Sequence, residues 1–158
     1  FLPIFIVQRQ AGSSAPFFTI YAIATITLRL IVGPMADRIG RRVIAAPALA
    51  LIAATMVAFN LVWSMPALYT LAVIYGVSFG TLFPMLSAYL VDVAPAHVRG
   101  SAVGVLTAGF DLGIMVGAYG GGVVAEYLGL GAAFTASGVL CMIGVVIFWL
   151  GTPAKRPV

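Results

Sequence analysis

Long apolar runs alternate with short polar stretches along the whole chain. The runs Phe17–Ala36 and Val43–Val62 each hold twenty residues. A helix needs about 20 apolar residues to cross the hydrocarbon core of a bilayer, where it satisfies its own backbone hydrogen bonds. The pattern therefore predicts five complete membrane spans and the remnant of a sixth, at residues 17–36, 43–62, 67–91, 101–127, 132–150 and, in part, 1–7.

The composition agrees with this pattern and excludes an ordinary soluble domain. Only 8% of the residues are charged and 63% are hydrophobic, and the mean hydropathy is +1.16. Soluble domains carry roughly 25% charged residues. The strands of a β-barrel would alternate apolar and polar positions, and no such alternation is visible. The predicted fold class is an all-α membrane protein, a polytopic transmembrane helix bundle.

The beginning of the chain suggests a fragment. It opens with Phe1–Val7, an apolar stretch without an initiating methionine or a basic leader. A secretory signal peptide would show a basic region before its apolar one. We therefore expect these residues to complete a helix that begins further upstream.

The sequence lacks the patterns of enzyme, metal and nucleic-acid sites. It shows no nucleophile beside an acid or base cluster, no phosphate-binding glycine loop and no set of metal ligands. The single cysteine, Cys141, lies in an apolar run, so it indicates neither a disulfide nor a thiol metal site. The net charge of +4 comes mainly from short loops between spans. We expect no enzymatic activity, no cofactor, no metal and no nucleic-acid partner.

The most polar stretch is GPMADRIGRR, Gly33–Arg42, which we call the charged hinge. It joins the first two complete spans and holds one acidic and three basic residues. Arginine can bind carboxylates or lipid phosphates through two parallel hydrogen bonds. A simpler interpretation is that the basic residues only anchor the chain at the membrane surface. However, the fixed spacing of the glycines and the aspartate is more specific than a membrane anchor requires.

Basic residues also predict the orientation of the bundle, because Lys and Arg of short loops concentrate on the cytoplasmic side. Consecutive loops alternate between the two sides. One side holds only Arg9. The other side holds the hinge, the loop 92–100 and the C-terminal tail, with six basic residues: Arg38, Arg41, Arg42, Arg99, Lys155 and Arg156. We expect the charged hinge and the C-terminus in the cytoplasm, and the protein in a bacterial inner membrane.

The pattern G-x-x-x-D-R-x-G-R-R in the charged hinge resembles the signature loop of the major facilitator superfamily. That loop joins the second and third helices of each six-helix half. The resemblance extends over the whole chain and includes VDVAPAHVRG with the glycine-rich span after it. The short basic tail and the sequence FFTIYAIATITLRLIVGPMADRIGRR resemble the C-terminal half of such proteins. The resemblance thus implies that residues 1–158 are one C-terminal domain whose partner is a missing N-terminal half.

The resemblance also implies a role for the charged residues. In this family an Asp–Arg network at the cytoplasmic loop latches one conformation of an alternating-access cycle. Asp92 would be the partner of the hinge within the half. Pro34, which follows the first glycine, departs from the family motif, but the family varies widely at that position. The residues assigned to the gate are Gly33, Asp37, Arg38, Gly40, Arg41, Arg42, Asp92 and Arg99.

Asp111 and Arg29 are charged residues within predicted spans. Asp111 lies about 15 Å, and Arg29 roughly 12 Å, from the cytoplasmic end at 1.5 Å per residue. An aspartate near the bilayer centre costs on the order of 2.5–3.5 kcal/mol on insertion scales, so such residues usually face a cavity or a partner. Both are candidates for a substrate or proton pathway. The alternatives are a structural Arg29–Asp111 ion pair, or an arginine that extends to the interface.

Small residues form a stripe along the span 101–127 and recur in the span 67–91. Stripes spaced by four residues let helices pack backbone to backbone, and they also permit sliding. The stripe resembles the glycine-rich helix of antiporters, although Ala118-Tyr119 stands where that motif has Gly-Pro. We favour close packing for these glycines, and a bending point at Pro84. The residues concerned are Gly76, Gly80, Pro84, Gly109, Gly113, Gly117 and Gly121.

Together these observations predict a secondary transporter that moves a small molecule across the lipid bilayer by alternating access, driven by protons. The predicted transporter is either an efflux or an uptake permease. The alternative is a receptor or scaffold of the same fold that binds without translocating.

Overall fold

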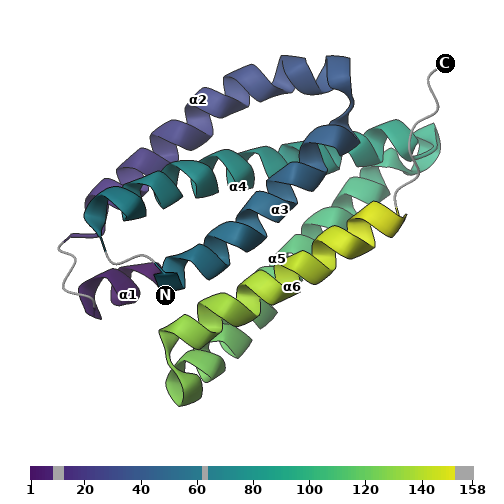
Figure 1. Ribbon diagram of the computed structural model, residues 1–158. Helices are drawn as coiled ribbons and strands as arrows, with labels where there is room; N and C mark the ends of the chain where they lie inside the picture. Colours follow the sequence, from purple (N-terminus) through teal and green to yellow (C-terminus); the bar gives the residue numbers. More distant parts are fainter. Residues whose placement is uncertain (9–12, 62–63, 152–158) are drawn as a thin grey trace.

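The computed structural model describes residues 1–8, 13–61 and 64–151. For residues 7, 8, 33, 34 and 37 it describes the backbone alone. Three residues used for the predicted orientation, Arg9, Lys155 and Arg156, lie outside this part. In the described chain every regular element is helical, which confirms the all-α prediction. The elements are α1 (Leu2–Gln8), α2 (Ala15–Ile39), α3 (Arg41–Leu61), α4 (Met65–Val93), the short 3-10 helix η1 (Ala96–Val98), α5 (Arg99–Leu128) and α6 (Leu130–Gly151) (Figure 1).

Five of the described helices, α2 to α6, contain segments long and apolar enough to cross a membrane. Each coincides with a predicted span, but each continues beyond the apolar run. The helix α2 includes Asp37 and Arg38 of the charged hinge, and α4 includes Asp92. Backbone hydrogen bonding continues until a residue breaks it, whereas the sequence pattern ends where polarity begins. Pro16 and Pro66 occupy the first turns of α2 and α4, where a missing amide hydrogen costs nothing.

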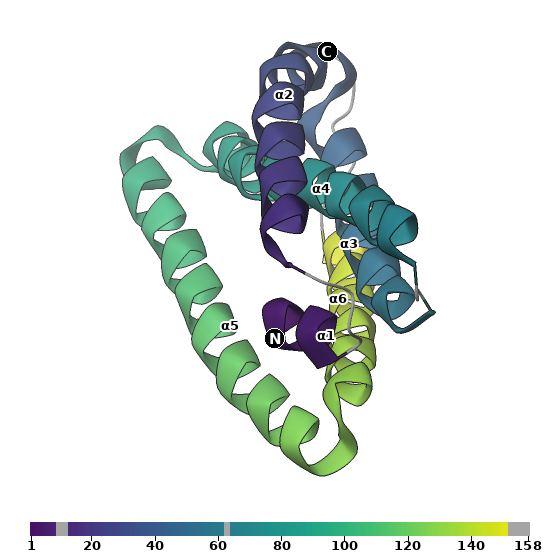
Figure 2. The ribbon, with the colours of Figure 1, turned by 90° about the vertical axis from the view of Figure 1, so that its left-hand side faces the viewer.

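The helix α4 lies at the centre of the bundle and packs against both α2 and α3. The helix α3 also packs against α6, and α6 packs against α5. Figure 2 shows α5 at one edge of the bundle, with the short helix α1 between it and the other helices. No residue of α5 is buried within the described chain. One long apolar helix is therefore left with most of its surface uncovered.

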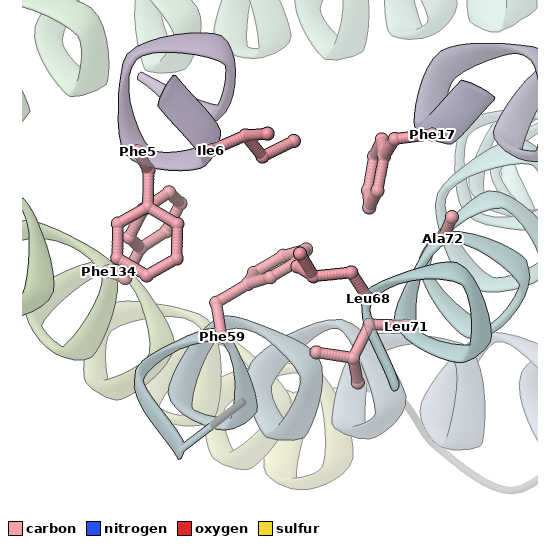
Figure 3. Packing of buried hydrophobic residues seen from close by; sticks show 8 residues of the cluster. All are labelled: Phe5, Ile6, Phe17, Phe59, Leu68, Leu71, Ala72 and Phe134. Carbon is pink, nitrogen blue, oxygen red and sulfur yellow. The ribbon is translucent and has the colours of Figure 1, made fainter. Parts of the chain in front are cut away.

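A hydrophobic cluster closes the end of the bundle opposite the charged hinge (Figure 3). Phe59 of α3 lies at its centre, 5.9 Å from the ring of Phe17 and 5.4 Å from that of Phe134. The ring of Phe134 in turn meets Phe5 of α1 edge to face at 5.1 Å. Such ring pairs contribute about 0.5–1.5 kcal/mol beyond the area they bury. The cluster thus holds α1, α2, α3 and α6 together.

Two glycines let α4 approach α2 closely. A Cβ atom on Gly76 would lie 2.6 Å from the backbone oxygen of Tyr21, and one on Gly80 would lie 2.5 Å from Cγ2 of Thr25. The hydroxyl of Thr25 donates a hydrogen bond of 3.0 Å to the carbonyl of Gly76 across this contact. The packing role predicted for Gly76 and Gly80 is therefore present in the structure.

A second close contact joins α3 to α6. A Cβ on Gly138 would lie 2.8 Å from the side chain of Val57. Nearby, the amide of Asn60 donates to the carbonyl of Gly131 at 2.8 Å and to the hydroxyl of Thr135 at 2.6 Å. Polar side chains bonded across apolar helices are a recognised means of helix association in membranes. Asn60 lies in the last turn of α3, which ends at Leu61.

The substitution Gly76→Ala should destabilise the α2–α4 contact. The added methyl group meets a backbone oxygen that cannot rotate away, so the helices must separate, at about 1–3 kcal/mol. Thermal unfolding of the purified full-length protein in detergent measures this loss. Gly104→Ala is the matched control, since a Cβ at Gly104 meets no atom within 4 Å. Equal unfolding temperatures for the two variants would contradict the close contact.

Candidate functional site

The charged hinge is a helix–helix corner, and the prediction of a loop was wrong. The helix α2 continues through Gly33 and Pro34 to Ile39, and α3 begins at Arg41. Gly40 alone separates them. Its φ of 107° lies in a region that favours glycine, and its amide donates to the carbonyl of Ala36 at 3.0 Å. The charged residues are thus fixed on two helix ends.

Arg41 links the corner to the end of α4. Its Nη1 lies 3.1 Å from Oδ1 of Asp92 and donates to the carbonyl of Ala88 at 2.6 Å. The side chains of Arg41 and Asp92 are 25% and 36% exposed. Water therefore screens this ion pair in part, and an exposed pair contributes at most about 1 kcal/mol. The pairing agrees with the partner that the resemblance assigned to the hinge.

Arg42 links the same corner to the end of α6. Its Nη2 donates to the carbonyl of Trp149 at 2.9 Å, and its guanidinium carbon lies 4.7 Å from the centre of the Trp149 ring. Cation–ring contacts of this kind contribute about 0.5–1 kcal/mol where exposed. Two adjacent arginines at the start of α3 therefore hold the ends of α4 and α6. We call this region the charged end of the bundle.

Among the described residues, Arg38 and Arg99 make no such links between helices. Arg38 is exposed. Arg99 donates from Nε to the carbonyl of Ala94 at 3.3 Å, a contact within its own turn. Gly33 and Asp37 belong to the helical backbone of α2, and their surroundings lie outside the described part of the structure.

Asp111 and Arg29 are exposed on α5 and α2. Among the described residues no ion pair joins them, so the structure does not contain the Arg29–Asp111 pair that similar depth allowed. The residue before Asp111, Phe110, contacts α4 through the rings of Phe79 and Phe83, at 6.2 Å and 5.1 Å. Asp111 is thus placed beside the α4–α5 contact, on the uncovered helix.

The glycine stripe of α5 does not pack against another helix within the described chain. A Cβ on Gly109, Gly113 or Gly117 would meet no atom within 4 Å. At Gly121 it would meet only the ring of Phe1, at 3.3 Å. The close backbone packing expected for this stripe is therefore not seen here. The bending point expected at Pro84 stays a prediction, and Pro84 lies inside the continuous helix α4.

A pocket of about 450 Å³ lies beside the hydrophobic cluster. Side chains from α2, α3, α4 and α6 form most of its wall, and Phe1, Leu2 and Gly121 complete it. Small-molecule sites typically measure about 300–1,000 Å³ and are mostly apolar. The pocket therefore has the size and character of a ligand site.

Comparison with known proteins decides the family. The sequence model of the Major Facilitator Superfamily matches residues 1–158. The chain belongs to this superfamily. It is therefore an integral membrane protein of a transporter family, as its five long apolar helices also indicate. No solved structure matches the chain.

Several curated superfamily members are similar to it. The staphylopine export protein of Staphylococcus aureus is 26% identical and covers 99% of this chain. The multi-drug resistance efflux pump PmrA of Streptococcus pneumoniae is 28% identical over 93% of the chain, and multidrug resistance protein 2 of Bacillus subtilis is 24% identical over 89%. The chain spans 41%, 38% and 35% of these relatives, respectively.

Sequence reasoning missed two features of this superfamily member. Trp149 lies two residues before the end of α6, and an aromatic residue at the end of an apolar span is a typical interfacial signal. The pocket was missed because its aromatic residues come from separate helices.

The ion pair at the charged end can be tested with a double-mutant cycle. Each of the substitutions Arg41→Gln and Asp92→Asn should lower the free energy of unfolding of the full-length protein. The double variant should lose about 0.5–1 kcal/mol less than the sum of the two single losses, because the interaction can be lost only once. Thermal unfolding at low and high salt measures both effects, and the coupling should shrink at high salt.

Arg99→Gln combined with Asp92→Asn provides the control cycle. Arg99 bonds the carbonyl of Ala94, so these two substitutions should be additive. Additivity in the Arg41–Asp92 cycle as well would show that the ion pair contributes nothing.

Proposed function

We propose that the chain is the C-terminal half of a secondary transporter that exports a small molecule by alternating access, driven by the proton gradient. The observation that carries the proposal is Asp111, a carboxylate in the middle of an apolar helix with no hydrogen bond or ion pair among the described residues. A charge at such a depth usually faces a water-filled cavity or a partner. We assign that place to a cavity shared with the N-terminal half.

The uncovered surface of α5 supports this arrangement. The helices α2, α3, α4 and α6 bury residues against one another, whereas α5 buries none within the described chain. A helix that lines a central cavity needs such a free face. Transporters of this construction bind their substrate near the bilayer midplane between two similar halves, which rock against each other.

The charged end supplies the rigid element that rocking requires. Arg41 and Arg42 connect the start of α3 to the ends of α4 and α6 through side-chain contacts. The bundle can then move as one body while its corner, with Asp37 and Arg38, faces the other half. The remaining residues of the gate, Gly33, Gly40 and Arg99, would shape the corner and the turn before α5.

Export and location also belong to the proposal. The three relatives above are named for export, efflux or drug resistance, which favours outward transport. Their bacterial hosts, and the distribution of basic residues, favour the inner membrane with the charged end in the cytoplasm.

Asp111→Asn should strongly reduce proton-driven transport. The amide keeps the shape of the side chain but cannot bind and release a proton, so uphill transport should fall by about tenfold or more. Everted membrane vesicles containing the full-length protein, energised to form a pH gradient, measure this effect with fluorescent substrates. Glu126→Gln is the matched control, since Glu126 is an exposed acid near the other end of α5.

The outcome separates the candidate functions. Gradient-driven transport that survives in Asp111→Asn would contradict the proton role of this residue. Saturable binding without any gradient-driven transport by the unmutated protein would instead support the alternative, a receptor or scaffold of the same fold.

A further inference from the structure

Four glycines, each four residues after the one before, form a row along α5. The row consists of Gly109, Gly113, Gly117 and Gly121. At about 100° per residue, Phe110 falls on the side of the helix that carries the row, whereas Asp111 and Gly104 fall on the opposite side. Because the ring of Phe110 contacts α4, the row is turned toward the bundle and Asp111 is turned away from it.

The described chain fills the space in front of this row at one end only. A Cβ atom at each of the first three glycines of the row would meet no described atom within 4 Å. At Gly121 it would lie 3.3 Å from the ring of Phe1, and at the neighbouring Gly122 it would lie 3.9 Å from that ring. Figure 2 shows the short helix α1 at this place, between α5 and the other helices. The start of α1 thus covers the last glycine of the row.

The course of α1 shows where a preceding helical segment would lie. After Gln8 the chain continues to α2, which begins at the end of the bundle that holds the hydrophobic cluster. Residues that precede Phe1 therefore lead the other way, toward the charged end. The row also extends from Gly121 toward the charged end, because α5 begins where α4 stops.

The lengths of the segment and of the row agree. A helix needs about 20 residues to cross the bilayer, and α1 supplies seven. The other residues, about 13, would extend about 20 Å at a rise of about 1.5 Å per residue. From Gly121 back to Gly109 the row extends about 18 Å. This chain spans less than half the length of the three relatives described above, so further chain is present in proteins of this kind.

We propose that the row is a docking surface for the part of helix α1 that precedes Phe1, within the same half of the transporter. The inference rests on the proposed function, which makes the chain one half of a longer protein. Glycines spaced by four residues let two apolar helices approach backbone to backbone, and this contact offsets the stability that glycine costs a helix. Asp111, on the opposite side of α5, stays free to face the cavity shared with the other half.

Alanine substitutions test whether the row is covered, because the sign of their effect depends on the neighbour. In open space alanine stabilises a helix relative to glycine, whereas against a closely packed backbone it destabilises the protein. Gly113→Ala and Gly117→Ala should each lower the unfolding temperature of the full-length protein in detergent by about 1–3 °C. Gly104→Ala, on the opposite side of α5, is the control and should not lower it. Unfolding temperatures that stay the same or rise in Gly113→Ala and Gly117→Ala would overturn the proposal.

Disulfide formation tests which helix covers the row. Gly113→Cys, in a cysteine-free full-length protein, is combined with a single cysteine at each of the about 13 positions before Phe1, and a protease site is inserted beside the exposed Ser13. A disulfide needs Cα atoms about 4.4–6.8 Å apart, so oxidation should link the two fragments at positions that recur every three or four residues. With Gly117→Cys the linked positions should move toward Phe1. Links to cysteines of the N-terminal half instead, or no links, would overturn the assignment to α1.

Thiol labelling lets this proposal and the transport proposal fail separately. A charged, water-soluble thiol reagent should label Asp111→Cys in membrane vesicles, because that position faces the proposed cavity, but should label Gly113→Cys only after unfolding in sodium dodecyl sulfate. Labelling of both in the folded protein would place the row on the cavity, which overturns the docking proposal and keeps the transport proposal. Protection of both, together with the disulfides described above, would keep the docking proposal and refute the cavity at Asp111.

Discussion

The close approach of α4 to α2 at Gly76 and Gly80 is the constraint on which the rest of the bundle depends. In a membrane, lipid tails are as apolar as the helices, so burial of apolar surface does not drive helices together. Contact has to come from dense packing and from hydrogen bonds between helices. Gly76 supplies the first by leaving space for a backbone oxygen, and its own carbonyl accepts from Thr25 to supply the second. With α2 fixed on α4, the corner at Gly40 determines where α3 starts.

The same physics is repeated at α3 and α6, with a different distribution of roles. Gly138 provides the close approach and Asn60 provides the hydrogen bonds. At the other end of α3, Arg41 and Arg42 bond to backbone carbonyls of α4 and α6. These residues thus act as polar clamps as well as charges, which explains why adjacent arginines are placed at a helix start. A lysine could provide one point of contact, but it lacks the flat guanidinium that stacks on Trp149.

Sequence reasoning located the spans because length and apolar composition alone determine which segments cross a bilayer. It also selected Gly76 and Gly80, whose spacing places both on one face of α4. It failed at the charged hinge, since polarity suggested a loop whereas Asp37 and Arg38 continue α2 to a break at Gly40. It could not identify Trp149 as the partner of Arg42, or Asn60 as the clamp on α6. Such contacts join residues 107 and 71 positions apart, and no local pattern encodes which helices become neighbours.

The glycines of α5 differ from those of α4, and the difference bears on the role of that helix. At Gly76 and Gly80 the missing side chain is necessary, because other atoms already occupy its place. At Gly109, Gly113 and Gly117 the described chain leaves the place empty. A glycine that no neighbouring atom requires makes a helix less stable than alanine would. A row of three such glycines therefore destabilises α5, and no contact within the described chain compensates for it. The row flanks Asp111, the other costly residue on α5. Both the glycine row and the carboxylate are explained if α5 faces partners beyond the described chain, as the proposed transport cycle requires.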